Sequence, residues 1–159
     1  MDTDFIGRPN DFEFLVGHWH IDNRRLRRRH VGSSDWDEFA ATSQAWMHLG
    51  GIVSVDEVHF PTQGFSGCTL RTLDLATRRW AIYWINSTKG VLFPPVHGGF
   101  AGERGEFHGI DDDDGRAVQV RFIWLRQGPD AARWEQAFSL DGQSWETNWV
   151  MTLRRVSGE

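Results

Sequence analysis

The chain of 159 residues is poor in several residue types, with one cysteine, one lysine, one tyrosine and five prolines. The single cysteine, Cys68, cannot form a disulfide within the chain, so we expect the fold to be stable without one. No segment approaches the ~18 consecutive apolar residues of a membrane-spanning helix, and the mean hydropathy is −0.47, so we expect no membrane partner. The opening "MDTDFIGRPN" lacks the basic and apolar regions of a secretion signal, which favours a cytoplasmic location.

Positive charge is also scarce. The 17 lysines and arginines stand against 22 aspartates and glutamates, which gives a net charge of −5. This balance opposes general affinity for the phosphates of nucleic acids, so we expect no nucleic-acid partner. The length fits one domain, and we expect residues 1–159 to fold around a single core.

Aromatic residues and glycines, in contrast, are abundant. The chain has nine tryptophans, eleven phenylalanines and seventeen glycines. A helical bundle would instead be rich in alanine, leucine, glutamate and lysine. Aromatic residues punctuated by glycine favour strands and turns, so the composition predicts an all-β protein.

Short runs of alternating apolar residues, separated by turn residues, recur along the chain. One helical turn is expected at "NDFEFLVG", residues 10–17, capped by Asn10 or Asp11. The expected strands are residues 18–30, 35–48, 52–60, 66–75, 79–87, 117–127, 132–140 and 145–156, with one or two more in the segment 97–110 that leads to the acidic residues 111–114. "DDDDG" suits a hairpin turn. About nine to ten antiparallel strands with short connections predict an up-and-down β-barrel, which either fills its interior or encloses one ligand.

These segments also resemble a known family. "DFEFLVGHWH", in which a G-x-W motif from Gly17 to Trp19 opens the first strand, is similar to the start of lipocalin-like (calycin) barrels. The ordered set "FLVGHW", "RRLRRR…GSSDW", "LGG", "RWAIYW", "PPVHGGF" and "RWEQAFSLDGQSWETNWVM" resembles an uncharacterised bacterial family of lipocalin-like domains over nearly the whole chain. The resemblance implies a barrel with an internal pocket, but no particular reaction.

Calycin barrels related to this family include carriers of fatty acids and pigments, a haem-binding nitrobindin group and a few enzymes. The nitrobindin resemblance would imply an axial histidine late in the chain, whereas the last histidine is His108. We therefore expect no haem and no other cofactor.

His18, His20 and Asp22 alternate along the first expected strand and therefore share one face. Similar HxH strands contribute to metal sites in cupin barrels, where further ligands join them. Trp19 points to the opposite face. Because the G-x-W tryptophan is expected to face inward, the histidines are expected to face outward, and we expect no metal in the barrel.

Five arginines occupy positions 24, 25 and 27–29. On a strand they divide between the two faces, which weakens a continuous basic surface. Acidic residues at positions 35, 37 and 38 would lie on the neighbouring strand and pair with them. Arg25 differs in sharing the face of Trp19 and Asn23, where its guanidinium could bind a ligand's carboxylate through two hydrogen bonds.

Several tryptophans share a strand face with other large or polar side chains, as Trp134 does with Gln136. Such residues often form a filled core, but nine tryptophans also suit an aromatic-lined cavity with a few polar groups. A histidine beside glycines, as in "PPVHGGF", could reach a ligand from a loop. The candidate ligand-binding residues are Trp19, Asn23, Arg25, Trp84, His97, Trp124, Gln136 and Trp149.

The orientation of the strand "IVSVDEVHF" remains open. Glu57 and His59 share one face, Ser54 and Asp56 share the other, and the two faces are equally apolar. If the first face is buried, Glu57 or His59 could act as an acid or a base.

Binding of a small molecule is our main expectation from the sequence. The ligand would be apolar or aromatic with a polar or anionic end, held inside a tryptophan-lined barrel. The alternative is a cofactor-independent isomerase, lyase or hydratase that uses Glu57 or His59 in the same pocket. A third interpretation is a non-catalytic interaction domain that forms a homodimer through an apolar sheet face.

Overall fold

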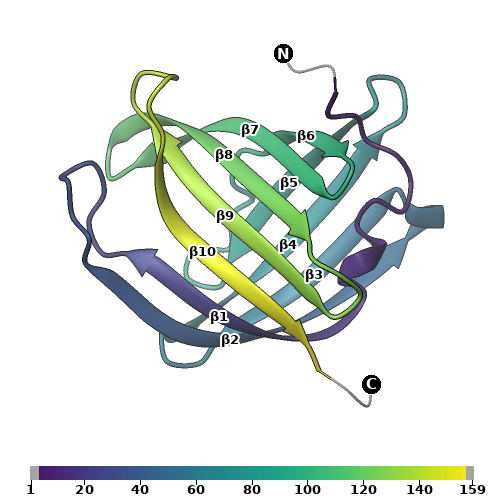
Figure 1. Cartoon of the computed structure of the whole chain (residues 1–159), viewed down its shortest axis with the longest axis horizontal. Helices are drawn as coiled ribbons and strands as arrows, with labels where there is room; N and C mark the ends of the chain where they lie inside the picture. The colour runs from purple at the N-terminus through teal and green to yellow at the C-terminus, as the bar shows by residue number, and fades with distance from the viewer. Residues whose placement is uncertain (1–3, 157–159) are drawn as a thin grey trace.

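The computed structural model describes residues 4–156, which form a closed antiparallel barrel of ten strands (Figure 1). The strands are β1 (Gly17–Leu26), β2 (Trp36–His48), β3 (Val53–Phe60), β4 (Phe65–Asp74), β5 (Arg79–Asn86), β6 (Val96–Ala101), β7 (Arg104–Asp113), β8 (Arg116–Arg126), β9 (Ala131–Ser139) and β10 (Glu146–Arg155). Each strand pairs with its neighbours in the chain, and β1 also pairs with β10, which closes the sheet. The predicted all-β up-and-down barrel is therefore confirmed.

One predicted boundary was wrong, since the first strand ends at Leu26 rather than residue 30. The segment 97–110 contributes to two strands, β6 and β7, joined at Gly102 with φ 60°, which makes the total ten. The hairpin turn predicted within "DDDDG" is present, since β7 continues to Asp113 and the turn consists of Asp114 and Gly115 at φ 53° and 85°. Two successive positive φ values are typical of the tight hairpin turns that match strand twist.

The predicted helical turn is present only as a short 3-10 helix, η1 (Glu13–Leu15). Its N-cap residue is Phe12, which makes no side-chain capping bond, so the predicted caps Asn10 and Asp11 were wrong. A second 3-10 helix, η2 (Leu49–Gly51), joins β2 to β3. Among residues 4–156, no helix is long and apolar enough to cross a membrane.

The barrel interior follows the period-2 alternation of the strands. In β1, Trp19, Ile21 and Asn23 are 1%, 1% and 2% exposed, whereas Asp22 and Arg24 between them are exposed. The orientation of Trp19 is therefore as predicted, and it fixes the inward face of every other residue along β1.

The N-terminal segment closes one end of the barrel (right-hand end in Figure 1, where η1 is drawn in purple). Phe12 is fully buried there, with ring centroids 4.9 Å from Trp80, 5.3 Å from Phe100 and 5.9 Å from Phe107. Asp11 accepts a hydrogen bond from the indole N–H of Trp80 at 3.0 Å. One aromatic side chain thus joins the segment to strands from across the sheet.

Two arginines hold this segment against the barrel by donating to its backbone carbonyls, which no helix satisfies. Arg126 donates to Asp11 O at 2.9 Å, and Arg155 donates to Phe14 O at 2.8 Å and to Val16 O. The guanidinium of Arg155 also lies 4.3 Å from the ring of Trp19, on β1. The closed end is thus packed with rings and sealed by charged hydrogen bonds.

We expect Phe12→Ala to lower the free energy of unfolding by about 3–5 kcal/mol, because it removes a fully buried ring and leaves a cavity at the closed end. Urea unfolding followed by tryptophan fluorescence would measure the change. Leu75→Ala is the control, since Leu75 is 64% exposed and should change stability by less than about 0.5 kcal/mol. A loss below about 1 kcal/mol for Phe12→Ala would contradict the role of this ring in closing the barrel.

Candidate ligand-binding cavity

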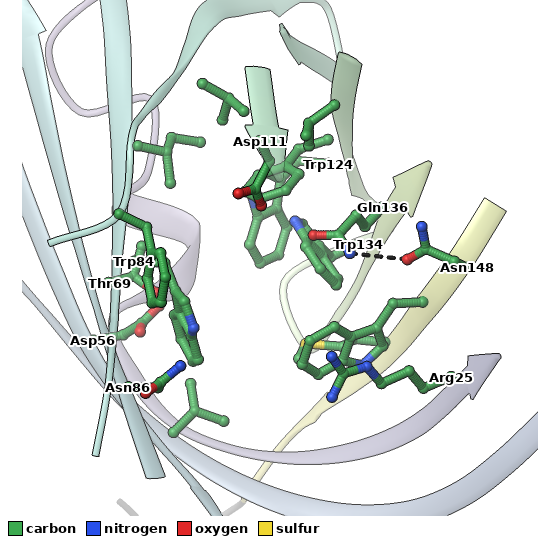
Figure 2. A pocket seen from close by; sticks show the side chains of 18 of the residues that line it. Arg25, Asp56, Thr69, Trp84, Asn86, Asp111, Trp124, Trp134, Gln136 and Asn148 are labelled. Carbon is green, nitrogen blue, oxygen red and sulfur yellow. Dashed lines mark hydrogen bonds between the residues drawn. The ribbon is translucent and has the colours of Figure 1, made fainter. Parts of the chain in front are cut away.

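A cavity of about 460 Å³ occupies the barrel between the closed end and the opposite end, where the chain forms a mouth (Figure 2). Its volume falls within the range of about 300–1,000 Å³ that is typical of small-molecule sites. Five tryptophans line it, and they are Trp19, Trp84, Trp124, Trp134 and Trp149. The barrel is therefore hollow, and its aromatic residues surround a space large enough for a ligand.

The β1–β2 connection partly covers the mouth by reaching across to other strands. Arg29 binds Asp113 on β7 through two nitrogens, Nε at 2.8 Å and Nη2 at 2.7 Å. The His30 backbone N–H donates to Glu146 Oε1 on β10 at 2.8 Å. The hydrogen bond and the charge of Asp113 raise the pKa of Arg29 against the lowering effect of burial.

The barrel wall is incomplete between β5 and β7 near the mouth. β6 pairs with β5 only through Trp80–Ile82, while β5 continues to Asn86 and β7 continues past β6 to Asp113. The loop 87–95 fills this interval and is tied to β5 by the Phe93 N–H, which donates to Trp84 O at 2.9 Å. Side chains from both edges of the gap therefore reach the cavity.

Arg25, at the mouth end of β1, is a half-buried cation within the cavity. Its guanidinium lies 4.3 Å from the ring of Trp149, and it makes no hydrogen bond or ion pair with any residue from 4 to 156. Burial, together with the charge of Arg29, lowers the pKa of Arg25 below its usual value. Its guanidinium donors are therefore available to an anion that would stabilise the desolvated charge.

Asn23 does not contact the cavity but holds the ring of Trp149, on which Arg25 lies. Its Oδ1 accepts from the indole N–H of Trp149 at 3.0 Å, and its Nδ2 donates to Phe39 O at 3.2 Å. Asn23 is 2% exposed and does not line the cavity. Asn23, predicted as a ligand contact, therefore lies behind the cavity wall, and both ends of its amide already have partners.

The aromatic rings of the cavity wall meet edge to face. Trp134 lies 5.6 Å from Trp149 at 82° and 5.0 Å from Phe122 at 73°. Across the cavity, Trp84 packs against Gly67 so closely that a Cβ on this glycine would lie 1.9 Å from the indole ring. Glycine at this position thus allows the ring to lie directly on the backbone of β4.

Three of these tryptophans present hydrogen-bond donors to the cavity. The indole N–H groups of Trp19 and Trp149 are bonded to Leu15 O and Asn23 Oδ1. Those of Trp84, Trp124 and Trp134 make no hydrogen bond with the part of the chain that the structure describes. A ligand inside the barrel would therefore meet donors as well as apolar surface.

Asp111 and Gln136 direct oxygen atoms toward the centre of the cavity (Figure 2). Burial and the charges of Asp112 and Asp113 raise the pKa of the Asp111 carboxyl, against the lowering effect of a hydrogen bond from the Asp112 N–H at 2.7 Å. Gln136 uses Nε2 to donate to Asn148 Oδ1 at 2.8 Å.

A buried ion pair lies in the wall formed by β3 and β4. Arg71 donates to Asp56 Oδ2 at 2.6 Å and to Ser54 Oγ at 3.0 Å. Arg71 is 2% exposed and Asp56 is 5% exposed, and both line the cavity together with Thr69. This polar group was missed by the sequence analysis. The sequence does contain opposite charges, Asp56 and Arg71, at inward positions of adjacent strands. These positions can be recognised as inward only once the pairing of β3 with β4 is known.

Six of the eight predicted ligand-binding residues line the cavity. They are Trp19, Arg25, Trp84, Trp124, Gln136 and Trp149. His97 does not, since it lies exposed on the outer face of β6 and its register partners are Ala81 and His108. Partial burial and the charge of Arg79 lower the pKa of His97. The predicted loop placement of His97 was wrong, because the residue belongs to β6, whose alternation turns it outward.

Glu57 and His59 also face outward. Each side chain is 57% exposed, and the two lie 3.8 Å apart between Glu57 Oε2 and His59 Nε2. His59 Nδ1 is also 2.9 Å from Ser66 Oγ. Since Ser54, Asp56, Val58 and Phe60 are the buried residues of β3, the predicted acid–base pair lies outside the cavity and cannot act on a ligand within it.

The histidines of the HxH motif lie on the outer face of β1, as predicted. His20 Nε2 is 3.2 Å from Asp22 Oδ1, and the Asp22 side chain is 69% exposed. Within residues 4–156, no group of three or more histidine, cysteine, aspartate or glutamate side chains is arranged to hold a metal ion.

The predicted pairs between the arginines 24–29 and the acidic residues 35–38 are present in β1, β2 and their connection. Arg24 lies 3.5 Å from Glu38, and Arg27 lies 2.6 Å from Asp35 and 3.2 Å from Asp37. These are exposed pairs, each of which contributes about 1 kcal/mol or less.

No family model and no curated protein matches the chain. The closed ten-strand barrel is compatible with a calycin-like fold.

We expect Asp111→Asn to increase the free energy of unfolding slightly at neutral pH. The pKa of Asp111 is raised by folding, so the folded state binds more protons between the usual aspartate pKa of about 4 and the raised value. Stability therefore falls as pH rises through this window, and asparagine avoids the loss. Urea unfolding of both proteins between pH 4 and 8 should show a difference that shrinks toward acid pH. An equal difference in the free energy of unfolding at every pH would contradict a raised pKa of Asp111 in the folded protein.

Proposed function

We propose that the protein is a lipocalin-like binding protein for a small aromatic or apolar molecule that carries an anionic group, with the anion held by Arg25. One observation carries this proposal. Arg25 places a partly desolvated guanidinium, which has no hydrogen-bond or ion-pair partner among residues 4–156, on the ring of Trp149 inside a tryptophan-lined cavity.

The pairing of the charged side chains supports an anionic group at Arg25. The cavity is lined by Asp56, by the aspartates at positions 111–114 and by three arginines, two of which are paired, Arg71 with Asp56 and Arg29 with Asp113. Arg25 is left without a partner among the described residues. A buried charge is costly unless it is paired, so a ligand carboxylate would complete the third pair. The planar guanidinium can bind a carboxylate through two parallel hydrogen bonds.

The aromatic wall supports a flat apolar body for the ligand. Rings prefer edge-to-face and offset contacts at centroid separations of about 4.5–7 Å. Trp134 and Trp149 already adopt this geometry, and Trp84 forms the facing wall. A planar ligand between these walls would make the same favourable contacts, and the indole N–H groups of Trp84 and Trp134 could donate to oxygen atoms along its edges.

We expect Arg25→Gln to weaken binding of 2-naphthoate, a bicyclic aromatic carboxylate, by about tenfold or more, because a hydrogen bond to a charged group contributes about 1.5–3 kcal/mol. Isothermal titration calorimetry would measure the affinity. The affinity of Arg25→Gln for neutral 2-naphthalenemethanol, which has the same ring, should fall much less.

Arg24→Gln is the matched control for this experiment. Arg24 is adjacent in sequence, but it faces solvent beside Glu38 with its side chain 54% exposed, so its removal should leave both affinities unchanged. An equal loss of 2-naphthoate affinity in the two variants would indicate a general effect of protein charge. Unchanged 2-naphthoate affinity in Arg25→Gln, or no binding of 2-naphthoate by the unaltered protein, would contradict the proposal.

Asp111 favours an enzyme as the second candidate function. It replaces the outward Glu57 and His59 as the carboxyl that could exchange a proton with a bound molecule, since it lines the cavity and its pKa is raised by burial. The alternative of a cofactor-independent isomerase, lyase or hydratase is therefore proposed with Asp111 in the acid–base role.

An enzyme would change the composition of a metabolite extract in a way that depends on Asp111. We expect one metabolite to fall and another to rise by the same amount with the unaltered protein, but not with Asp111→Asn, when both are monitored by mass spectrometry. Extracts that remain unchanged, or that change equally with both proteins, would contradict this second candidate.

A further inference from the structure

We infer that the cavity contains a second recognition point, formed by Asp56 and Thr69, that accepts a hydrogen-bond donor from the ligand. This inference rests on the proposed function and names the ligand class more closely. The ligand would be a hydroxylated aromatic acid, with a carboxylate at Arg25 and a hydroxyl group at the β3–β4 wall.

The first observation is an incompletely satisfied carboxylate. Asp56 Oδ2 accepts from Arg71 at 2.6 Å, while Asp56 Oδ1 is buried without a hydrogen-bond partner among the residues that the structure describes. Buried polar atoms are nearly always hydrogen-bonded, since an unpaired one costs about 1–3 kcal/mol. Asp56 is 5% exposed and lines the cavity, but Oδ1 itself has almost no accessible surface, and Arg71 Nε is likewise buried without a partner among these residues. A donor on a bound molecule would therefore reach Oδ1 with a small shift of the neighbouring side chains.

Arg71 fixes the position of this carboxylate. Its guanidinium also binds Ser54, and it lies 4.9 Å from the ring of Phe12 and 5.6 Å from that of Trp124. These contacts on several sides leave Arg71 little freedom to rotate. A guanidinium only donates hydrogen bonds, so the contact with Arg71 keeps Asp56 an ionised acceptor. The remaining lone pairs of the carboxylate can accept from other donors.

Thr69 adds a second polar group beside Asp56. The two residues are register partners on β4 and β3, and both face inward. The Thr69 hydroxyl makes no hydrogen bond with residues 4–156, although Thr69 is only 7% exposed. Figure 2 shows the pair beside Trp84, on the opposite side of the cavity from Arg25. A ligand hydroxyl could donate to Asp56 and accept from Thr69 at the same time.

The two recognition points define a ligand with polar groups at opposite ends. An anion at Arg25 and a hydroxyl at Asp56 and Thr69 would be separated by the tryptophan-lined space. A carboxylate could not take the second position, because Asp56 would repel it. The site therefore distinguishes the two ends of the ligand and sets its direction in the barrel.

Calorimetry with three matched probes tests this inference on the unaltered protein. The probes are 2-naphthoate, 6-hydroxy-2-naphthoate and 6-methoxy-2-naphthoate, which differ only at the end opposite the carboxylate. We expect the hydroxyl to tighten binding about tenfold relative to 2-naphthoate, and the methoxy group, which cannot donate, to remove this gain. Equal affinities for 2-naphthoate and its hydroxyl derivative would overturn the inference while leaving the role of Arg25 intact.

Two variants assign the preference to these residues. The double variant Asp56→Leu with Arg71→Met removes both charges together, a replacement that buried ion pairs often tolerate, and should abolish the preference for the hydroxyl probe. Thr69→Val keeps the ion pair and should reduce the preference at least threefold, so it provides a test even if the double variant does not fold. Thr72→Val, on the outer face of the same strand, is the control. A full preference that survives in Thr69→Val or in the folded double variant would overturn the inference.

Discussion

Closure of the ten-strand sheet is the constraint on which the rest of the structure depends. Because β1 pairs with β10, the sheet has an inside and an outside, and alternation assigns each strand residue to one of them. A one-residue change of register would move Trp19 outward and His20 inward. The N-terminal segment then closes one end with Phe12, and the opposite end is left for the mouth. The cavity is the space that remains when these rings pack against the wall and against each other.

Within this closed space, the arrangement of charges gives the cavity its chemical character. Arg71 is paired with Asp56 and held between aromatic rings, and Arg29 is paired with Asp113 across the mouth. Arg25 lies on the ring of Trp149, whose indole N–H is held by Asn23. A low-dielectric interior strengthens the attraction of such a cation for an anion, since fewer water molecules screen it. Packing, hydrogen bonding and electrostatics therefore converge on the same few side chains.

The sequence predicted the fold well because barrel formation depends on alternation and turn residues, which are local signals. The inward orientation predicted for Trp19 was correct, and it placed Arg25 on the inner face of the same strand. Asn23 was placed on the correct face, but its amide is occupied by Trp149 and Phe39, which are distant in sequence. In β3 both faces are apolar, so only pairing with β4 could show that Asp56, and not Glu57, faces inward. His97 was misplaced because the residues around it were read as a loop, and β6 turned out to be a short strand.

A crystal structure of the protein with 2-naphthoate would test the central claim most directly. We expect the naphthalene ring inside the barrel between Trp84 and Trp134, with its carboxylate oxygens about 2.7–2.9 Å from the guanidinium nitrogens of Arg25. The ring bound on the outer surface, or the carboxylate turned away from Arg25 toward Arg71, would contradict it.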